Sequence, residues 1–480
     1  MTTMPTLSVN GVMPSGTRKP GFYANFNTKN AINSLPGNAI EVLLVGQMLS
    51  AGSVAANTLQ PIYSVSDAES YFGTGSMLHL MALAAFKANA YLSLKAIGLV
   101  DASSSVAATW ALTVAGTSTV DNAMQLQIGA TFIPFSISNG DTAATVAANI
   151  KAQITQYPNL PVVATISGSV LTLTAKNKGS IANQLAMSLL KSAAVTGQSG
   201  LTFTLAQGVT GVIDPDITPA LTTAFSSGVN IVVSGWNNAE NLTALSTFLE
   251  NVSSPIEGRG CIGVSFVTST LSSATSLAAG LNEGRITIGL LRKAPNLSYE
   301  LAAMYGAVIA SEADPAMPLN TLALSGAVSN PPSQWLSRTE QEACLANGIT
   351  PFEIGPANSV QIVRAITTYT QNALSTPDPS LLDLATIRSL DYTRLAILTR
   401  MKLRFPRSKL SNRTADRVRS EILDVLYQLE AAEIIENVKA NAPQLLIGPD
   451  PTTPTQLNAV IPANVVPGLM IFAAQIDLII

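Results

Sequence analysis

The sequence is poor in charge, in histidine and in cysteine. Charged residues make up 11% of its 480 residues, less than half of the roughly 25% typical of soluble domains. One histidine excludes histidine-ligated metal clusters, and two cysteines are too few for a disulfide scaffold. Hydrophobic residues nevertheless reach 47%, and no charge-free run is apolar enough to suggest a membrane span. These absences indicate a large globular protein that buries much of its surface in an assembly.

Motifs that carry catalytic chemistry are also absent. The sequence contains no Gly-x-Ser-x-Gly elbow and no phosphate-binding loop ending in Gly-Lys-Ser/Thr. His79 lies in an apolar helical pattern, where a core or interface histidine is expected. Gly73-Thr74-Gly75-Ser76 lacks the lysine of a phosphate cradle, so we expect a turn with Ser76 as a helix cap. The sequence therefore predicts no enzyme, and no catalytic, metal-binding or cofactor-binding residue.

The two cysteines and the first residues of the chain add two smaller expectations. Cys261 and Cys344 are expected to be buried thiols that pack as small hydrophobic side chains. The first 22 residues lack the apolar segment of a signal peptide. We therefore expect the protein to fold in a cytoplasm.

Strand and helix patterns alternate in two parts of the chain. Three elements come first: Glu41–Gly46 (strand), Gly73–Asn89 (helix) and Tyr91–Gly98 (strand). Six more follow in the order strand, helix: Val229–Trp236, Ala239–Val252, Cys261–Val267, Leu271–Asn282, Arg285–Arg292 and Tyr299–Ser311. Such alternation predicts βαβ units and a parallel sheet. We assign both parts to one discontinuous α/β core, residues 23–101 and 212–376.

Residues 102–211 differ from their surroundings because they are rich in Ser, Thr, Ala, Gly and Val. Short strands are predicted at Ala111–Ala115, Met124–Ile128, Val162–Ile166 and Val170–Ala175. One helix is predicted near Asp141–Gln156, with Asp141 as its N-cap. This segment is interpreted as a β-rich domain inserted into the core.

The two ends of the chain have the patterns of arms. Residues 1–22 are rich in Pro, Gly, Ser and Thr and are predicted to be an N-terminal arm. A mixed C-terminal domain, residues 377–480, contains predicted helices Leu381–Arg404 and Thr414–Val438 and a very apolar last strand, Gly468–Ile480. The predicted fold class is α/β and α+β multidomain: a parallel-sheet core, an inserted β-rich domain, a mixed C-terminal domain and extended terminal strand arms.

Positive charge gathers in residues 385–419, which contain ten Lys and Arg against two acids. A solvated helical face, a nucleic-acid patch and a patch that docks on an acidic protein surface could each explain it. Aromatic residues are few, at 5%, and the chain as a whole is acidic. We therefore favour docking on an acidic protein surface and expect no direct nucleic-acid contact.

Several segments in order resemble a known family. They are Pro20-Gly21-Phe22-Tyr23, YFGTGSMLHLMALAAFKAN at Tyr71–Asn89, LRFPRSKLSNRTADRVRSEI at Leu403–Ile422 and the final GLMIFAAQIDLII. Together they resemble the tail sheath proteins of Mu-like contractile-tailed bacteriophages. The Phe-Glu-Pro-Asn turn of the better-known sheath group is absent, which fits the Mu-like branch. The resemblance covers nearly the whole chain, and the inserted segment is only loosely typical.

The resemblance implies a structural subunit of a contractile tail sheath. Such subunits form a homo-oligomer of stacked hexameric rings around the tail tube, which they drive through the host envelope by contraction. The expected partners are the tail tube protein and the baseplate and tail terminator proteins, without membrane insertion. The expected location is the virion, after assembly in the host cytoplasm. A non-contractile virion or filament protein, or an unrecognised α/β enzyme, remains an alternative.

Two sets of site residues follow from this resemblance. In the family, terminal arms add strands to neighbouring subunits. The strand-exchange candidates are Leu7, Val9, Val12, Met470, Phe472, Ile476 and Leu478. The candidates for contact with an acidic tube are Arg400, Lys402, Arg404, Arg407, Lys409 and Arg413.

Overall fold

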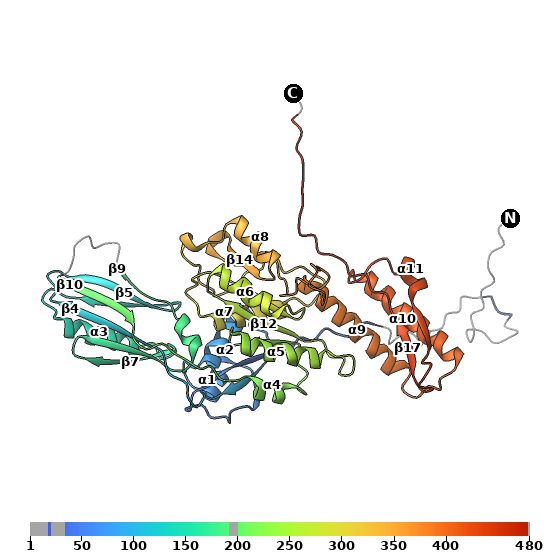
Figure 1. Cartoon of the computed structure of the whole chain (residues 1–480), viewed down its shortest axis with the longest axis horizontal. Helices are drawn as coiled ribbons and strands as arrows, with labels where there is room; N and C mark the ends of the chain where they lie inside the picture. The colour runs from blue at the N-terminus through green and yellow to red at the C-terminus, as the bar shows by residue number, and fades with distance from the viewer. Residues whose placement is uncertain (1–17, 21–33, 192–199, 479–480) are drawn as a thin grey trace.

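The computed structural model describes residues 18–20, 34–191 and 200–478, and all structural statements concern these residues. Figure 1 shows an elongated molecule with three parts side by side. A β-rich part lies at one end, a body of helices around a sheet lies in the middle, and a helical part lies at the other end. The predicted mixed α/β fold with several separate sheets is confirmed.

The middle part is built on one eight-stranded sheet. Its strands, in the order β15-β14-β13-β12-β11-β1-β3-β2, are Val360–Ile362, Thr350–Ile354, Ile286–Leu290, Ile262–Val267, Ile231–Ser234, Val42–Gln47, Leu94–Leu99 and Leu59–Ile62. Six neighbouring strands are parallel, and the edge strands β2 and β15 run antiparallel to them. Every residue of β1, β11, β12 and β13 is buried. Burial on both faces is expected of parallel strands covered by helices.

Helices cover both faces of this sheet. They are α1 (Val65–Phe72), α2 (Met77–Ala88), α4 (Thr218–Ala224), α5 (Ala239–Val252), α6 (Leu271–Leu281), α7 (Ser298–Ser311) and α8 (Arg338–Ala346). The α7 helix approaches β11 closely at Gly306, where a Cβ atom would lie 2.5 Å from Val233. On the opposite face, a Cβ at Gly263 would lie 2.9 Å from Leu245 of α5. Glycine is therefore required where the helices touch the strands.

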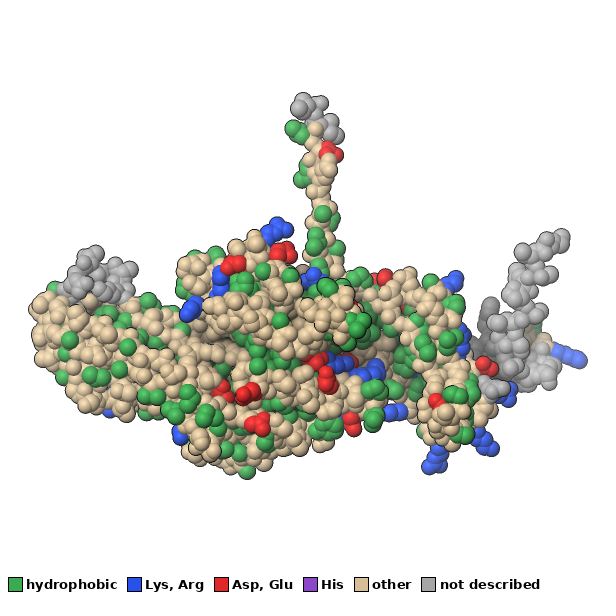
Figure 2. All heavy atoms as spheres, viewed as in Figure 1, with side chains coloured by type: hydrophobic (Ala, Val, Ile, Leu, Met, Phe, Trp, Pro, Cys, Tyr) green, Lys and Arg blue, Asp and Glu red, His purple; other side chains and the backbone are tan. Residues whose placement is uncertain are grey.

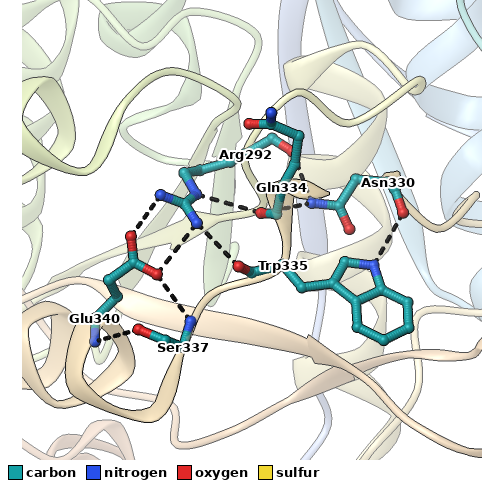
Figure 3. A network of polar contacts seen from close by, with 6 residues as sticks. All are labelled: Arg292, Asn330, Gln334, Trp335, Ser337 and Glu340. Atoms are coloured by element: carbon teal, nitrogen blue, oxygen red, sulfur yellow. Dashed lines mark hydrogen bonds and ion pairs between the residues drawn. The ribbon is translucent and has the colours of Figure 1, made fainter. Parts of the chain in front are cut away.

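A polar network fixes the loop between α7 and α8 to the sheet (Figure 3). The guanidinium of Arg292, just after β13, pairs with Glu340 of α8 at 2.6 Å. It also donates to the carbonyl oxygens of Gln334 and Trp335. The Asn330 amide donates to the carbonyl of Arg292. The network holds an irregular segment in place.

The inserted residues form their own sheets. One has the order β10-β4-β8-β7, with strands Leu201–Gln207, Thr109–Gly116, Val170–Ala175 and Val162–Ser167. The other has the order β6-β5-β9, with strands Thr131–Ile137, Asn122–Ile128 and Met187–Lys191. The α3 helix (Ala143–Thr155) begins one residue later than predicted. Its cap is Thr142, whose hydroxyl accepts from the Thr145 N–H, whereas the Asp141 carboxylate accepts from the Ser138 N–H in the preceding turn.

The helical end contains α9 (Leu384–Arg404), α10 (Asn412–Ala431), α11 (Val438–Asn441) and the hairpin β16–β17 (Leu446–Pro449 and Leu457–Val460). The helix predicted to continue to Val438 ends at Ala431. Glu433 and Asn437 have φ angles of 56° and 60°, a left-handed conformation that an α-helix cannot include. The chain turns back after α10, which buries Ile434 and Ile435 in a second apolar cluster with α9 and α10.

The last segment, predicted as a strand over Gly468–Ile480, forms no strand within the described part of the single chain. Figure 1 shows it leaving the body as an extended arm. A strand exists only when its backbone groups pair with another strand, and no described segment pairs with Gly468–Leu478.

Candidate functional site

The C-terminal arm, Gly468–Leu478, exposes side chains that are normally buried. Leu469, Ile471, Phe472, Ile476 and Leu478 are between 78% and 94% exposed. Figure 2 shows these apolar side chains on a segment that stands clear of the body. Exposed apolar surface of this kind marks a site of interaction. Of the predicted strand-exchange residues here, Met470 alone is half-buried.

The arm has one wholly apolar face. Side chains alternate between the two faces of an extended chain. The even-numbered described positions from Met470 carry Met470, Phe472, Ala474, Ile476 and Leu478. The odd face carries Leu469, Ile471 and Ala473 near the base of the arm and then Gln475 and Asp477, whose side chains hydrogen-bond at 2.5 Å. The arm therefore has one wholly apolar face and one face that becomes polar towards Leu478.

The base of the arm is fixed to the body. The Val466 N–H donates to the Ile434 carbonyl at 3.2 Å, and the Glu436 N–H donates to the Asn464 carbonyl at 2.8 Å. At Gly468 a Cβ atom would lie 2.5 Å from the Pro318 side chain. The arm thus leaves the molecule at a defined point.

The N-terminal segment also passes the helical end. The Tyr392 hydroxyl of α9 donates to the Pro36 carbonyl at 2.7 Å, and Leu35 packs against the apolar cluster of α9 and α10. The predicted exchange residues Leu7, Val9 and Val12 lie outside the described residues. Both ends of the described chain therefore meet the body near α9 and α10.

The β16–β17 hairpin presents two strand edges without a partner among the described residues. Leu446 and Val460, which face each other across the pair, are 61% and 63% exposed. The turn is built on Asp450, whose carboxylate accepts from Thr452, Thr453 and Asn458. These hydrogen bonds hold the pKa of Asp450 well below its ordinary value.

The hairpin is also tied to α10. The Arg419 guanidinium donates to the Ala442 carbonyl at 2.8 Å and to the Leu445 carbonyl at 3.3 Å. Sequence analysis missed this hairpin, although its turn sequence Asp450-Pro451-Thr452-Thr453 is a recognisable signal. A two-stranded sheet alone is marginally stable in water, so the bonds from Arg419 support a hairpin whose two edges have no partner among the described residues.

The predicted tube-contact residues fall into two groups. Lys402, Arg407, Lys409 and Arg413 are exposed at the end of α9, in the turn and at the start of α10. We call these four the basic end. Figure 2 shows Lys and Arg side chains projecting from the end of the molecule that holds α10. Their exposure makes them available to a partner.

Arg400 and Arg404 lie between the two helices instead. Arg400 is 5% exposed and pairs with Glu421 at 3.1 Å and with Asp424 at 2.7 Å. Arg404 lies 3.6 Å from Glu421. In this conformation Arg400 is not a surface residue, because its charge is used to join α9 to α10.

A second ionic junction joins α9 to the sheet. The Arg285 guanidinium, before β13, binds both carboxylate oxygens of Asp391, at 2.7 and 3.0 Å. Arg394 binds the same carboxylate at 2.9 Å. Two further basic residues between 385 and 419 thus have structural roles: Arg394 in this junction, and Arg388, which donates to the Glu312 carbonyl.

His79 lies in the core, as predicted. It is 1% exposed, and its Nδ1 accepts from the Gly75 N–H at 2.9 Å. Burial lowers its pKa, so the ring is neutral at pH 7. Ser76 caps α2 by accepting from the His79 N–H, as predicted. Cys261 and Cys344 are buried free thiols, and burial raises the pKa of Cys261 to about 12.

Within residues 18–20, 34–191 and 200–478, no group of three or more His, Cys, Asp or Glu side chains is placed to hold a metal ion. None of the helices in these ranges is long and apolar enough to cross a membrane.

Two family models match this chain. The phage tail sheath protein central domain matches residues 210–368. The phage tail sheath C-terminal domain matches residues 376–479, so the two together span more than half of the chain. The Mu-like prophage FluMu tail sheath protein of Haemophilus influenzae is 28% identical over 489 residues, which cover 99% of this chain and 100% of that protein.

Solved structures resemble the fold over almost its whole length. The sheath tail protein from Desulfitobacterium hafniense has a TM-score of 0.50 at 14% identity and covers 94% of this chain and 97% of its own. A chain of the anti-feeding prophage baseplate in the contracted state has a TM-score of 0.50 at 12% identity, covering 97% of this chain and 98% of its own. At such low identity these likenesses concern the fold.

Proposed function

Because this chain belongs to the phage tail sheath family, we propose that it polymerises as stacked hexameric rings around a tail tube and contracts to drive the tube through the host envelope. A structural role in a sheath, and a place in the virion, follow from the family itself. Ring stacking, contraction and assembly in the host cytoplasm are the finer parts of the proposal. The observation that carries it is the C-terminal arm, an extended segment with one apolar face and no strand partner among the described residues.

The arm adds a strand to a neighbouring subunit. Its eleven described residues reach at most about 40 Å when fully extended. Backbone hydrogen bonds supply the affinity of an added strand, and alternate side chains set its register. The even face of the arm would then be buried, and Gln475 and Asp477 would face water.

The receiving sheet is the β16–β17 hairpin of the neighbour. Both of its edges are free of partners among the described residues, and its exposed Leu446 and Val460 offer apolar surface. The N-terminal arm, with Leu7, Val9 and Val12, is proposed to occupy the second edge. Arms held in this way keep subunits linked while their bodies move, which contraction requires.

The basic end contacts the tail tube, whose outer surface is expected to be acidic. Lys402, Arg407, Lys409 and Arg413 are the exposed members of the predicted set. Arg404 lies beside them and keeps its pairing with Glu421. Arg400 is left out of this contact because it is buried. Baseplate and tail terminator proteins are proposed as further partners at the two ends of the sheath.

The domain division expected from the sequence stays our proposal. Strands of residues 42–99 and 231–362 share one sheet, and strands of residues 109–207 form two others. This supports a core of residues 23–101 and 212–376 with an inserted domain at 102–211, between an arm at 1–22 and a C-terminal domain at 377–480. The inserted domain, at the end of the molecule opposite the basic end (Figure 1), is proposed to face outwards.

Polymerisation with matched arm variants tests the proposal. The purified chain is expected to form long tubes visible by electron microscopy and to sediment as polymers. Phe472→Asp with Ile476→Asp places charge on the even face and should abolish the tubes. Ala473→Asp, the control, places a charge on the odd face and should leave them. A wild-type chain that stays monomeric at high concentration would contradict the sheath assembly, and equal effects of the two variants would contradict the strand addition.

A further inference from the structure

The most exposed large apolar side chains of the body gather at one edge of the eight-stranded sheet. Outside the C-terminal arm, four such side chains among the described residues are more than 80% exposed. They are Tyr63 (82%), Tyr91 (99%), Ile256 (94%) and Leu374 (85%). Scattered exposed apolar residues need no explanation, but these four share one location.

The strand register defines this location. Val42 pairs with both Leu94 and Ile231, and Ile231 pairs with Ile262. The parallel strands β1, β3, β11 and β12 therefore begin together, at what we call the amino edge. The next strand, β13, begins beside Gly263.

Each of the four side chains lies in a loop at the amino edge. Tyr91 precedes β3, and Ile256 lies between α5 and β12. Tyr63 follows β2, whose Ile62 pairs with the first residue of β3. The segment that leads to Leu374 is held by Asn282, just before β13, whose side-chain oxygen accepts from the N–H groups of Thr370 and Gln371 at 2.9 and 3.1 Å.

Part of α9 extends this edge. Leu395 and Leu398, which lie one helical turn apart, are 42% and 39% exposed. A cavity of about 310 Å³ between α9 and the amino edge is lined by Leu395, Leu398 and Gly258, among others. The opposite side of α9 is already buried in the apolar cluster with α10. A helix with apolar residues on two sides is typically packed against other elements on both of them.

Several charged groups around this edge are paired within the chain. Lys95 binds Glu41 at 2.6 Å, and Arg259 binds Glu257 at 3.0 Å. Asp391 is held between Arg285 and Arg394. Lys402, which also lines the cavity, is exposed and marks the border with the basic end. The surface at the amino edge is thus apolar with a largely neutralised polar rim, the composition of a protein–protein contact.

We propose that the amino edge, with Tyr63, Tyr91, Ile256 and Leu374, together with Leu395 and Leu398 of α9, docks on a second copy of this chain. Its largely neutral character disfavours the acidic tube and nucleic acid and suits a partner as poor in charge as this chain. The contact is head-to-tail, because only a contact between different surfaces continues into rings or helical polymers. The inference rests on the proposed function.

The C-terminal arm explains how a small docking surface can contribute to polymerisation. A neighbour tethered by a short arm has a high effective concentration at this edge, so the contact adds to the assembly without needing high affinity of its own. Tyr is also among the residues that most often dominate binding at interfaces.

Footprinting of side chains with hydroxyl radicals tests the docking directly. Tyr63 and Tyr91 are compared in monomers, in polymers of this chain alone and in polymers on the tube, with Phe132 of β6, 42% exposed, as control. We expect several-fold protection of both tyrosines in polymers of this chain alone. Equal modification in monomers and polymers would overturn the proposal. Protection that appears only on the tube would assign the edge to the tube and overturn it as well.

Charge substitutions give an independent test. Tyr91→Glu with Ile256→Glu should lower the association constant of polymerisation at least about tenfold for each side chain, as expected from loss of a buried large apolar group. The control is Val163→Glu on β7, where the side chain is 51% exposed. Unchanged polymerisation of the double variant, with an unchanged melting temperature, would overturn the docking and leave the sheath function standing. A wild-type chain that never polymerises would overturn both.

Discussion

His79, the only histidine of the chain, is the residue whose environment most clearly links structure to pH. Its ring is buried, and its Nδ1 accepts a backbone N–H. Burial lowers its folded-state pKa below the ordinary value of 6.5. The unfolded chain therefore binds a proton more readily than the folded chain as the pH falls through 6.5, which costs stability.

We accordingly expect the melting temperature of the wild-type chain to fall between pH 7.5 and pH 5.5. His79→Asn keeps an acceptor near the Gly75 N–H but does not titrate in this range, so its melting temperature should change less. A wild-type melting temperature that is flat over this range, or an equal fall in the variant, would contradict the assignment. Differential scanning calorimetry at both pH values makes the comparison.

Arg400 and Lys402 are neighbouring cations of α9 with different roles: Arg400 is buried in ion pairs, and Lys402 is exposed. The Arg400 side chain is 4% exposed and holds two carboxylates. Arg400→Met keeps the bulk and removes the charge, and it should destabilise the helical end by about 2 kcal/mol, because Glu421 and Asp424 lose their cation. The matched change Lys402→Met at an exposed position should cost less than about 0.5 kcal/mol.

Hydrogen exchange of the α10 amides reports this difference locally. Faster exchange in Arg400→Met than in Lys402→Met is the expected result. Equal exchange rates in the two variants would show that the buried ion pairs of Arg400 do not stabilise the helical end. Arg400 would then again be a candidate for contact with the tube.

At the scale of elements, the strongly periodic or uniformly buried segments could be predicted from the sequence. The sequence pattern predicts the α5 helix with its observed bounds. The strands β1, β11, β12 and β13 could be predicted because each is a short apolar run. Short or irregular strands could not be predicted. The β2 strand contains Pro61 and β14 contains Pro351, residues that argue against a strand in any sequence reading.

The site was predictable in part for a similar reason. The apolar arm is a local pattern, so Met470, Phe472, Ile476 and Leu478 could be chosen from the sequence, although their proposed role stays a prediction. Which arginines reach the surface depends on the pairing of α9 with α10. That pairing brings Arg400 to Glu421 and Asp424, residues 21 and 24 positions away, and a local pattern does not contain such a contact.

The β16–β17 hairpin provides a prediction at this scale. Asp450 organises its turn by accepting from three residues. Asp450→Ala removes these bonds, so the strands of the proposed receiving sheet should fray. We expect the variant to fold, as judged by circular dichroism, and to form fewer or shorter tubes by electron microscopy. Tube lengths equal to those of the wild type would argue against the hairpin as the receiving sheet.

At the scale of the whole molecule, charge is sparse and is used at particular places. Many charged side chains join parts of the chain, as in the Arg285–Asp391–Arg394 junction. Within residues 385–419, the basic end is the main group of positive side chains that stay exposed. The sparse charge that first indicated burial in an assembly fits a subunit that offers neutral faces to its neighbours and one basic surface to a different partner.

Reversing the basic end tests that division of roles. Arg407→Glu, Lys409→Glu and Arg413→Glu together should weaken binding to the tail tube, more strongly at low salt, because screening reduces the contribution of exposed charges. Polymers of the variant alone should still form. Co-sedimentation with the tube at two salt concentrations measures the effect. Loss of the polymers themselves would show that these residues serve contacts between subunits.

The central claim is that the C-terminal arm of one subunit completes the β16–β17 sheet of another. Electron cryo-microscopy of the polymers tests it most directly. We expect residues 468–478 of each subunit to be seen as a strand hydrogen-bonded to the hairpin of a neighbour, with Phe472 and Ile476 buried. An arm that folds back on its own subunit, or that remains unpaired in a well-resolved polymer, would contradict this strand addition.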